Sequence, residues 1–173
     1  MSRFRVTPPE QGLPPTKYPK SLALRAHQCH GGHMWIDAKG STVLPAPECM
    51  RLLAVAAKDA GVGRIGVPTD QAPVVVPVNF GIRDHQVFIR VGPGFFSQAA
   101  DGRLVAFEVD HVSAPEGEAW SVLVRGLARL IESPTEEELA MVAHPLVPEP
   151  GEMILIVRPD VITGRLFEFR QTS

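Results

Sequence analysis

The sequence has little cysteine, no excess of positive charge and no long apolar run near its amino terminus. Its two cysteines, Cys29 and Cys49, are too few for a disulfide framework, so we expect both thiols to be reduced. Seventeen Lys and Arg against 19 Asp and Glu give a net charge of −2, which excludes the basic surface typical of nucleic-acid binding. Because neither a secretory signal nor a membrane span is visible, the sequence predicts a cytoplasmic protein without a nucleic-acid or membrane partner.

The composition, with 45% hydrophobic and 21% charged residues in 173, is typical of one soluble domain. We expect residues 1–44 to form a largely irregular amino-terminal arm. Residues 7–20 carry five prolines, and residues 21–43 show weak alternation with one short candidate strand at "HMWID". Residues 45–173 are expected to form the domain itself.

Six β-rich runs dominate this domain, at residues 62–68, 72–80, 86–91, 103–112, 119–131 and 153–159. The links "TDQ", "GIRDH", "PEGE" and "PDVITG" are mostly short and polar, as between antiparallel neighbours. Helices are expected over 45–61, over 95–101 and from Ser133, where Ser and Pro precede a run of acids. The sequence therefore predicts a mainly β fold with a few helices, built on a six-stranded antiparallel barrel.

Two motifs invite a catalytic interpretation, and each has a simpler one. Ser121 lies in a strand pattern without elbow glycines, which favours an ordinary strand serine over a nucleophile. The segment "HQCHGGH" matches no standard zinc spacing, and only Cys49 offers a further ligand elsewhere, so a polar loop is favoured over a metal-assisted hydrolase. The zinc-type side chains of this segment are His27, Cys29, His30 and His33.

The run at 72–80 alternates between two faces. Val74, Val76, Val78 and Phe80 share one face, and Val75, Pro77 and Asn79 share the other. Pro77 cannot donate a hydrogen bond within a sheet. It therefore indicates either a plain edge strand or a stretch whose backbone faces something else, such as a planar ring system.

Charged residues within the strands need partners, because an unpaired buried charge is costly. Arg90 lies among apolar neighbours and requires a carboxylate, a phosphate or solvent. Glu108 and Asp110 lie on one face of their strand, and we favour an ion-pair network between them and Arg125.

Taken in order, "VGRIGV", "APVVVPVNF", "VFIRVGPG", "VAFEVD", "AWSVLVRG" and "VITGRL" resemble the FMN-binding split-barrel proteins related to pyridoxamine 5′-phosphate oxidase. The resemblance covers about residues 48–166. It implies a split β-barrel that forms a homodimer, with FMN or a deazaflavin in clefts between the subunits and a small-molecule substrate. It also implies a set of cofactor-binding residues: Val78, Asn79 and Phe80 along the ring, Arg90 and Val91 toward the phosphate, Trp120 near the dimer interface, and Arg165 in "TGR". To these we add Phe96 and Ser97 as candidates, because they follow directly on the expected phosphate end.

The chain departs from this family at three positions. Phe96 stands where relatives commonly have the phosphate-binding lysine, and Ala119 stands where they have glycine. Val76 replaces an arginine of the oxidase proper, which argues against pyridoxamine phosphate oxidase activity. Losing one cation lowers phosphate affinity roughly ten- to a hundredfold, although Arg90, Ser97, Gln98 and the amides that open the 95–101 helix are alternative anion donors.

Two functions follow as hypotheses. The first is a flavin- or deazaflavin-dependent oxidoreductase, in which the cofactor carries the chemistry; no catalytic acid or base is assigned. The second is a non-catalytic split-barrel protein that binds or sequesters a flavin, heme or other planar ligand, or that has lost its cofactor. Phe95 and Phe96 favour the second, since they either close the cleft or stack on a planar ligand other than FMN.

Overall fold

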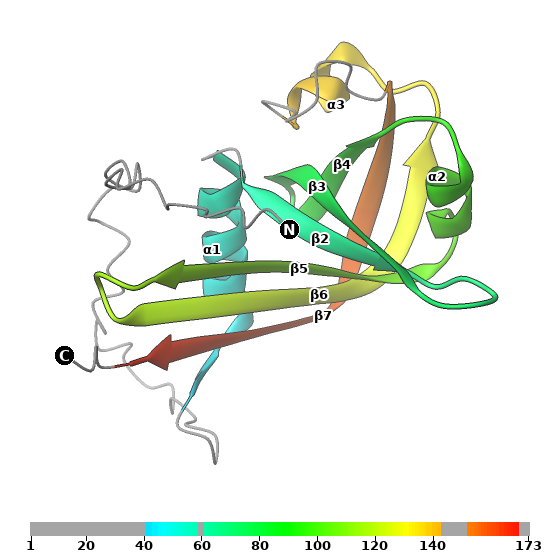
Figure 1. Ribbon diagram of the computed structural model, residues 1–173. Coiled ribbons are helices and arrows are strands. Elements are labelled where there is room, and N and C mark those ends of the chain that lie inside the picture. The colour runs from blue at the N-terminus through cyan, green and yellow to red at the C-terminus, as the bar shows by residue number, and fades with distance from the viewer. Residues whose placement is uncertain (1–40, 59–60, 143–151, 170–173) are drawn as a thin grey trace, which may run out of the picture.

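The computed structural model describes residues 41–58, 61–142 and 152–169. The elements of these ranges follow in chain order (Figure 1). They are β1 (Thr42–Leu44), α1 (Ala46–Lys58), β2 (Val62–Val67), β3 (Val74–Arg83), β4 (Gln86–Val91), α2 (Phe95–Ala100), β5 (Leu104–Ser113), β6 (Glu118–Ile131), α3 (Glu136–Ala140) and β7 (Met153–Glu168).

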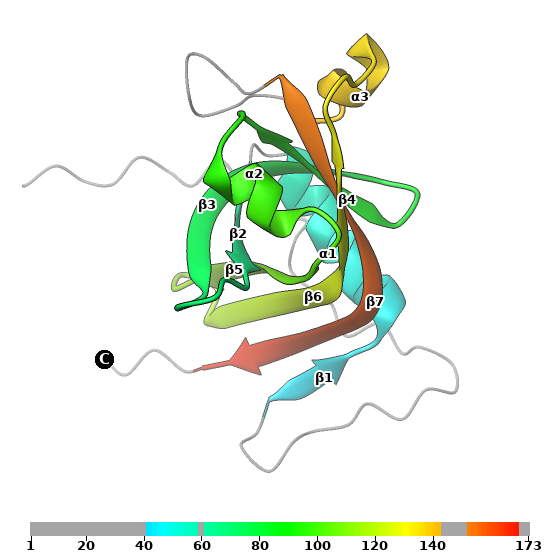
Figure 2. The same ribbon diagram turned by 90° about the vertical axis from the view of Figure 1, so that its right-hand side faces the viewer.

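Six of the strands close into an antiparallel barrel, and this confirms the predicted fold. Their order is β7-β4-β3-β2-β5-β6, and β6 pairs with β7 to complete the ring. The seventh strand, β1, is added to the outer edge of β7 through the pair Val43↔Arg165. Seen toward one end of the barrel, α2 lies at the mouth (Figure 2). The helix α1 packs its buried face into the same hydrophobic core as the strands.

The last strand differs from the sequence prediction. The link expected at "PDVITG" is wrong, because β7 runs through it to Glu168 and pairs with β6 along almost its whole length. The register shifts between Arg125 and Gly126, which face Val161 and Pro159, so Asp160 is the extra residue of a β-bulge. A bulge tolerates Pro159, which a regular ladder would not.

The boundaries at two other links also differ. The turn between β3 and β4 is only Asp84 and His85, both with positive φ, so "GIR" belongs to the strand. The helix α3 starts later than Ser133. Thr135 is its N-cap and forms a capping box with Glu138: the Thr135 hydroxyl accepts from the Glu138 amide, and the Glu138 carboxylate accepts from the Thr135 amide.

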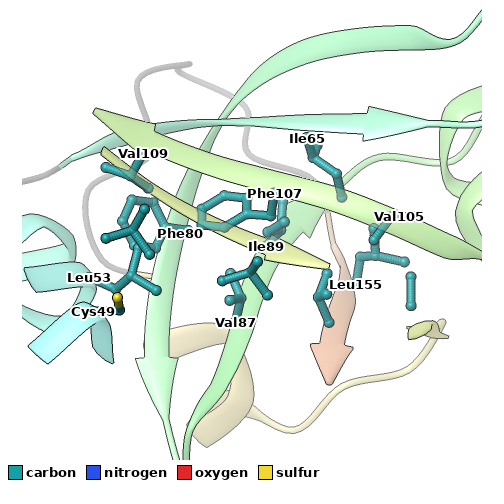
Figure 3. Packing of buried hydrophobic residues seen from close by; sticks show 14 of the residues in the cluster. Cys49, Leu53, Ile65, Phe80, Val87, Ile89, Val105, Phe107, Val109 and Leu155 are labelled. Atoms are coloured by element: carbon teal, nitrogen blue, oxygen red, sulfur yellow. The ribbon is translucent and has the colours of Figure 1, made fainter. Parts of the chain in front are cut away.

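The core lies between the inward faces of the strands and the buried face of α1 (Figure 3). Phe80 and Phe107 meet edge to face at its centre, with ring centroids 5.0 Å apart. Cys49 on α1 is a buried free thiol whose pKa is raised by burial, so the thiol form is favoured there. No helix of the described ranges is long and apolar enough to cross a membrane.

A pair of carboxylates facing each other across β6 and β7 makes stability depend on pH. Glu118 lies opposite Glu168. Burial raises the pKa of the Glu118 carboxyl, and Glu116 and Glu168 raise it further. When the pKa of a carboxyl is higher in the folded than in the unfolded state, the protein loses stability as the pH rises through the unfolded-state pKa and then the folded-state pKa. At a pH below both values the group has no effect on stability.

We therefore expect Glu118→Gln to stabilise the protein by about 0.2–1 kcal/mol at neutral pH, and the gain to vanish in acid. Thermal unfolding at neutral pH and below about pH 4 measures both values. Glu132→Gln, which removes an exposed carboxylate from the end of β6, is the control. A gain that persists undiminished in acid would contradict the electrostatic explanation.

The expected arm, residues 1–44, falls mostly outside the described ranges. The strand β1 occupies its last three residues. The candidate strand "HMWID" and the segment with His27, Cys29, His30 and His33 lie outside the described residues.

Candidate functional site

The ladder between β3 and β4 stops part-way along both strands. Its pairs run from Arg83↔Gln86 to Phe80↔Ile89 and end there. One more step in register would set Asn79 opposite Arg90, but Arg90 pairs with Ile154 of β7, while Asn79 pairs with Val62 of β2. We call this point, where the two strands part between Asn79 and Arg90, the fork.

Beyond the fork, β3 has a free edge within the described part of the chain. Residues 74–79 pair with β2 on one side, and no described strand pairs with them on the β4 side. Pro77 lies in this stretch and is exposed. Pro77 in the sequence indicates either a plain edge strand or a stretch whose backbone faces a ligand. A free strand edge at the fork agrees with both interpretations.

The outer surface of the fork is polar, and its inner surface belongs to the core. Asn79 and Arg90 are half-buried and face outward, and the Asn79 side-chain amide lies 3.4 Å from the carbonyl oxygen of Gly61, to which it donates. Val78 packs against the core, and Phe80 and Val91 are buried in it. A ligand at the outer surface would therefore meet the side chains of Asn79 and Arg90, and at Val78, Phe80 and Val91 only the backbone.

The loop after β4 leads from the fork to α2. Gly92, Pro93 and Gly94 are exposed, and a side chain added at either glycine would contact nothing. The hydroxyl of Ser97 is buried and donates to the Gly94 carbonyl over 3.0 Å, so it closes the turn rather than facing outward. The six-residue α2 is too short for its N-terminal amides to make an anion site by themselves.

The two phenylalanines that begin α2 differ in environment. Phe96 is half-buried and packs against the core cluster. Phe95 is 68% exposed. The barrel therefore partly covers Phe96, and of the two rings only that of Phe95 is mostly open to a ligand.

Two of the expected site residues lie far from the fork. Trp120 on β6 is buried in the core, with its ring 5.9 Å from that of His111. Arg165 on β7 is half-buried and lies between Val43 and Ser121. Trp120 is distant because β6 is three strands from β3 in either direction around the ring. Arg165 is distant because it lies far along β7 from Ile154, the residue of β7 that pairs with Arg90.

Sequence reasoning missed Arg64, which holds the acidic pair of β5. Its guanidinium Nη1 lies 2.6 Å from Asp110 Oδ1 and 3.5 Å from Glu108 Oε2. Burial raises the pKa of Glu108, Asp110 raises it further, and Arg64 partly offsets both. The prediction that Arg125 pairs with these acids is wrong. Arg125 faces Ala106, two residues from Glu108, and has no ion pair among the described residues.

The geometry of the described residues supports neither a serine nucleophile nor a metal site. Ser121 faces Asp110 on β5 and Arg165 on β7, so no histidine pairs with it across either ladder. Among the described residues there is no group of three metal-ligating side chains.

The family assignment comes from comparison with known proteins. The family model for pyridoxamine 5′-phosphate oxidase matches residues 45–165, which include β2 to β6 and most of β7. The chain belongs to this family. A curated relative, the uncharacterized protein Rv0080 of Mycobacterium tuberculosis, is 30% identical over 135 residues, which cover 74% of this chain and 86% of the relative.

Solved structures give the same family fold. A FAD binding protein from Mycobacterium smegmatis is 34% identical, with a TM-score of 0.59 and coverage of 73% of this chain and 98% of that one. A FAD-binding protein from Mesorhizobium loti is 22% identical, with a TM-score of 0.57, and covers 74% of this chain and 99% of its own, which shows the shared fold.

Proposed function

We propose that the protein binds a flavin at the outer surface of the fork and works as a flavin-dependent oxidoreductase. The observation that carries this proposal is the parting of β3 and β4 beside Arg90, in a family member that is 34% identical to a FAD binding protein. A free strand edge supplies backbone donors and acceptors, and an arginine beside it supplies positive charge.

The residues present fit a flavin nucleotide. The guanidinium of Arg90 suits a phosphate, which carries about 1.5–2 negative charges near neutral pH. Pro77 presents an exposed apolar ring on the same face, and the amide of Asn79 both donates and accepts hydrogen bonds. Gly92 and Gly94 keep the approach along the loop free of side chains.

The division of labour follows from these residues. A bound flavin supplies hydride and single-electron chemistry. Arg90 would anchor the phosphate, Asn79 would orient the ring through its polar edge, and the backbone of 78–80 would set the ring's height above the barrel. We assign no general acid or base, so the roles proposed for these groups are to bind and position the flavin.

The proposed assembly is a homodimer. The outer face of β5, β6 and β7 carries a continuous row, Val112, Ala119 and Phe167, in which Val112 is 64% exposed, with Leu123 and Val161 exposed further along. Charged residues, among them Asp110 and Arg165, lie between these apolar side chains, and exposed aromatic and aliphatic residues mixed with polar ones are typical of protein interfaces. Two barrels joined through this face would bring Arg165 of each subunit to the interface, because Arg165 lies beside Phe167 on β7.

We expect Leu123→Asp to shift the protein from dimer to monomer, because the interface would bury an uncompensated charge. Sedimentation equilibrium measures the mass directly. Ala140→Asp, an equal charge change at an exposed residue of α3, is the control and should leave the mass unchanged. A wild-type protein that sediments as a monomer at all concentrations would contradict the dimer.

The oxidoreductase activity has its own test. Flavin-loaded protein should be bleached anaerobically by a nicotinamide dinucleotide or by a reduced deazaflavin, and its visible spectrum should recover on adding an acceptor. Bound flavin that neither donor reduces would favour the second function, a protein that binds or sequesters a planar ligand. The exposed ring of Phe95 is the observation that favours that alternative.

A further inference from the structure

Phe95 is the most exposed large apolar side chain of the described residues, at 68%, and hydrogen bonds hold the backbone turn that precedes it. The backbone of Gly94 has φ 153°, a value that side chains disfavour, and its carbonyl accepts from the Ser97 hydroxyl and from the Gln98 amide over 3.0 and 3.3 Å. No other aromatic ring of the described residues lies against Phe95. An aromatic ring held open to solvent in this way is prepared to stack on a planar group.

The segment around Phe95 is poor in charge. Between Arg90 and Asp101 the chain has no Lys, Arg, Asp or Glu. A ligand that extends from Arg90 along this loop therefore meets glycine backbone and then an aromatic face. Arginine, glycine loop and aromatic ring in this order suit a ligand with a phosphate followed by a base. A ligand that ends at its phosphate would make no contact with the aromatic ring.

The distance permits a dinucleotide. Phe95 follows Arg90 by five residues, so their Cα atoms are separated by at most roughly 17 Å. The adenosine half of an extended FAD covers a span of the same order as this limit. FMN ends at the phosphate and would leave Phe95 uncovered.

We propose that Phe95 stacks on the adenine of FAD and makes the site selective for FAD over FMN. This inference rests on the proposed function and adds the identity of the nucleotide. Stacking of a base on an aromatic side chain is worth about five- to a hundredfold in affinity. We expect wild type to bind FAD at least about fivefold more tightly than FMN.

The test compares Phe95→Ala, Phe95→Leu and Phe95→Trp, titrated with FAD and with FMN. The alanine variant should lose at least about fivefold in FAD affinity and change little with FMN. Leucine keeps apolar area without a π-face and should resemble alanine, whereas tryptophan should resemble wild type. Because Phe95 is exposed, all three variants should keep the wild-type unfolding temperature.

Flavin fluorescence gives a readout independent of affinity. Adenine stacked on the ring of free FAD quenches its emission, so binding to wild type should raise the emission, and binding to Phe95→Ala should raise it less. Equal losses of FAD and FMN affinity, or no loss of either in Phe95→Ala, would overturn the role of Phe95. Binding of neither flavin by wild type would overturn the proposed function itself.

Discussion

The Phe107→Ala variant is expected to lose about 3–5 kcal/mol of unfolding free energy. Phe107 is fully buried on β5, in edge-to-face contact with Phe80, and its ring fills space that Gly63 leaves free on the neighbouring strand. Removing the ring empties the centre of the barrel, where surrounding strands relax only partly. Since a domain of this size is stable by about 5–15 kcal/mol, the loss should be plain in any unfolding experiment.

Urea denaturation followed by circular dichroism measures this effect. The midpoint should fall while the slope stays near the wild-type value, because the same surface is exposed on unfolding. Leu104→Ala, an exposed position at the start of the same strand, is the control and should change stability by no more than about 0.5 kcal/mol. A Phe107→Ala midpoint close to wild type would mean that the ring is not at the centre of the core.

The Arg90→Ala variant is expected to bind flavin about ten- to a hundredfold more weakly. A charge-assisted hydrogen bond to a phosphate is worth about 1.5–3 kcal/mol, and the segment that follows Arg90 offers no second cation before Arg103. Arg90→Lys should recover part of the affinity, because it restores the charge without the planar fork of donors. Isothermal titration with FMN and FAD measures each constant.

The matched control for Arg90 is Arg158→Ala. Arg158 is an exposed arginine of β7, the strand that also pairs with Arg90, and removing it changes the net charge equally. Its flavin affinity should stay within about twofold of wild type, and the salt dependence of binding should fall only in the Arg90 variant. Equal affinities for wild type and Arg90→Ala would contradict the placement of the phosphate at the fork.

The barrel could be predicted because each of its six strands carries its own local signal. Alternation in "RLVAFEVDHV" and the turn residues around it determine β5 without knowledge of its neighbours. The three residues of β1 carry no such signal, since their strand conformation depends on pairing with the far end of β7. The second half of β7 was hidden by Pro159 and Gly164, which resemble a turn until the bulge and the long β6 partner are known.

The candidate site was predictable to a smaller extent. Alternation separated Asn79 from Val78 and Phe80, and Pro77 marked the stretch that turned out to have a free edge. The point where β3 and β4 separate depends on how the whole barrel closes, so no local sequence pattern predicts it. Arg64 was missed for a similar reason: its position opposite Glu108, 44 residues away in the chain, depends on the register between two strands.

The most direct test of the account is a visible absorption spectrum of the full chain, recorded as purified and then during titration with FAD, FMN and a deazaflavin. We expect a flavin spectrum, or saturable shifts of the added flavin's bands that end at one flavin per chain. A deazaflavin or heme spectrum would place a different planar ligand in the family fold. A colourless protein that shifts the bands of no added flavin would contradict the central claim, that the fork beside Arg90 is a flavin site.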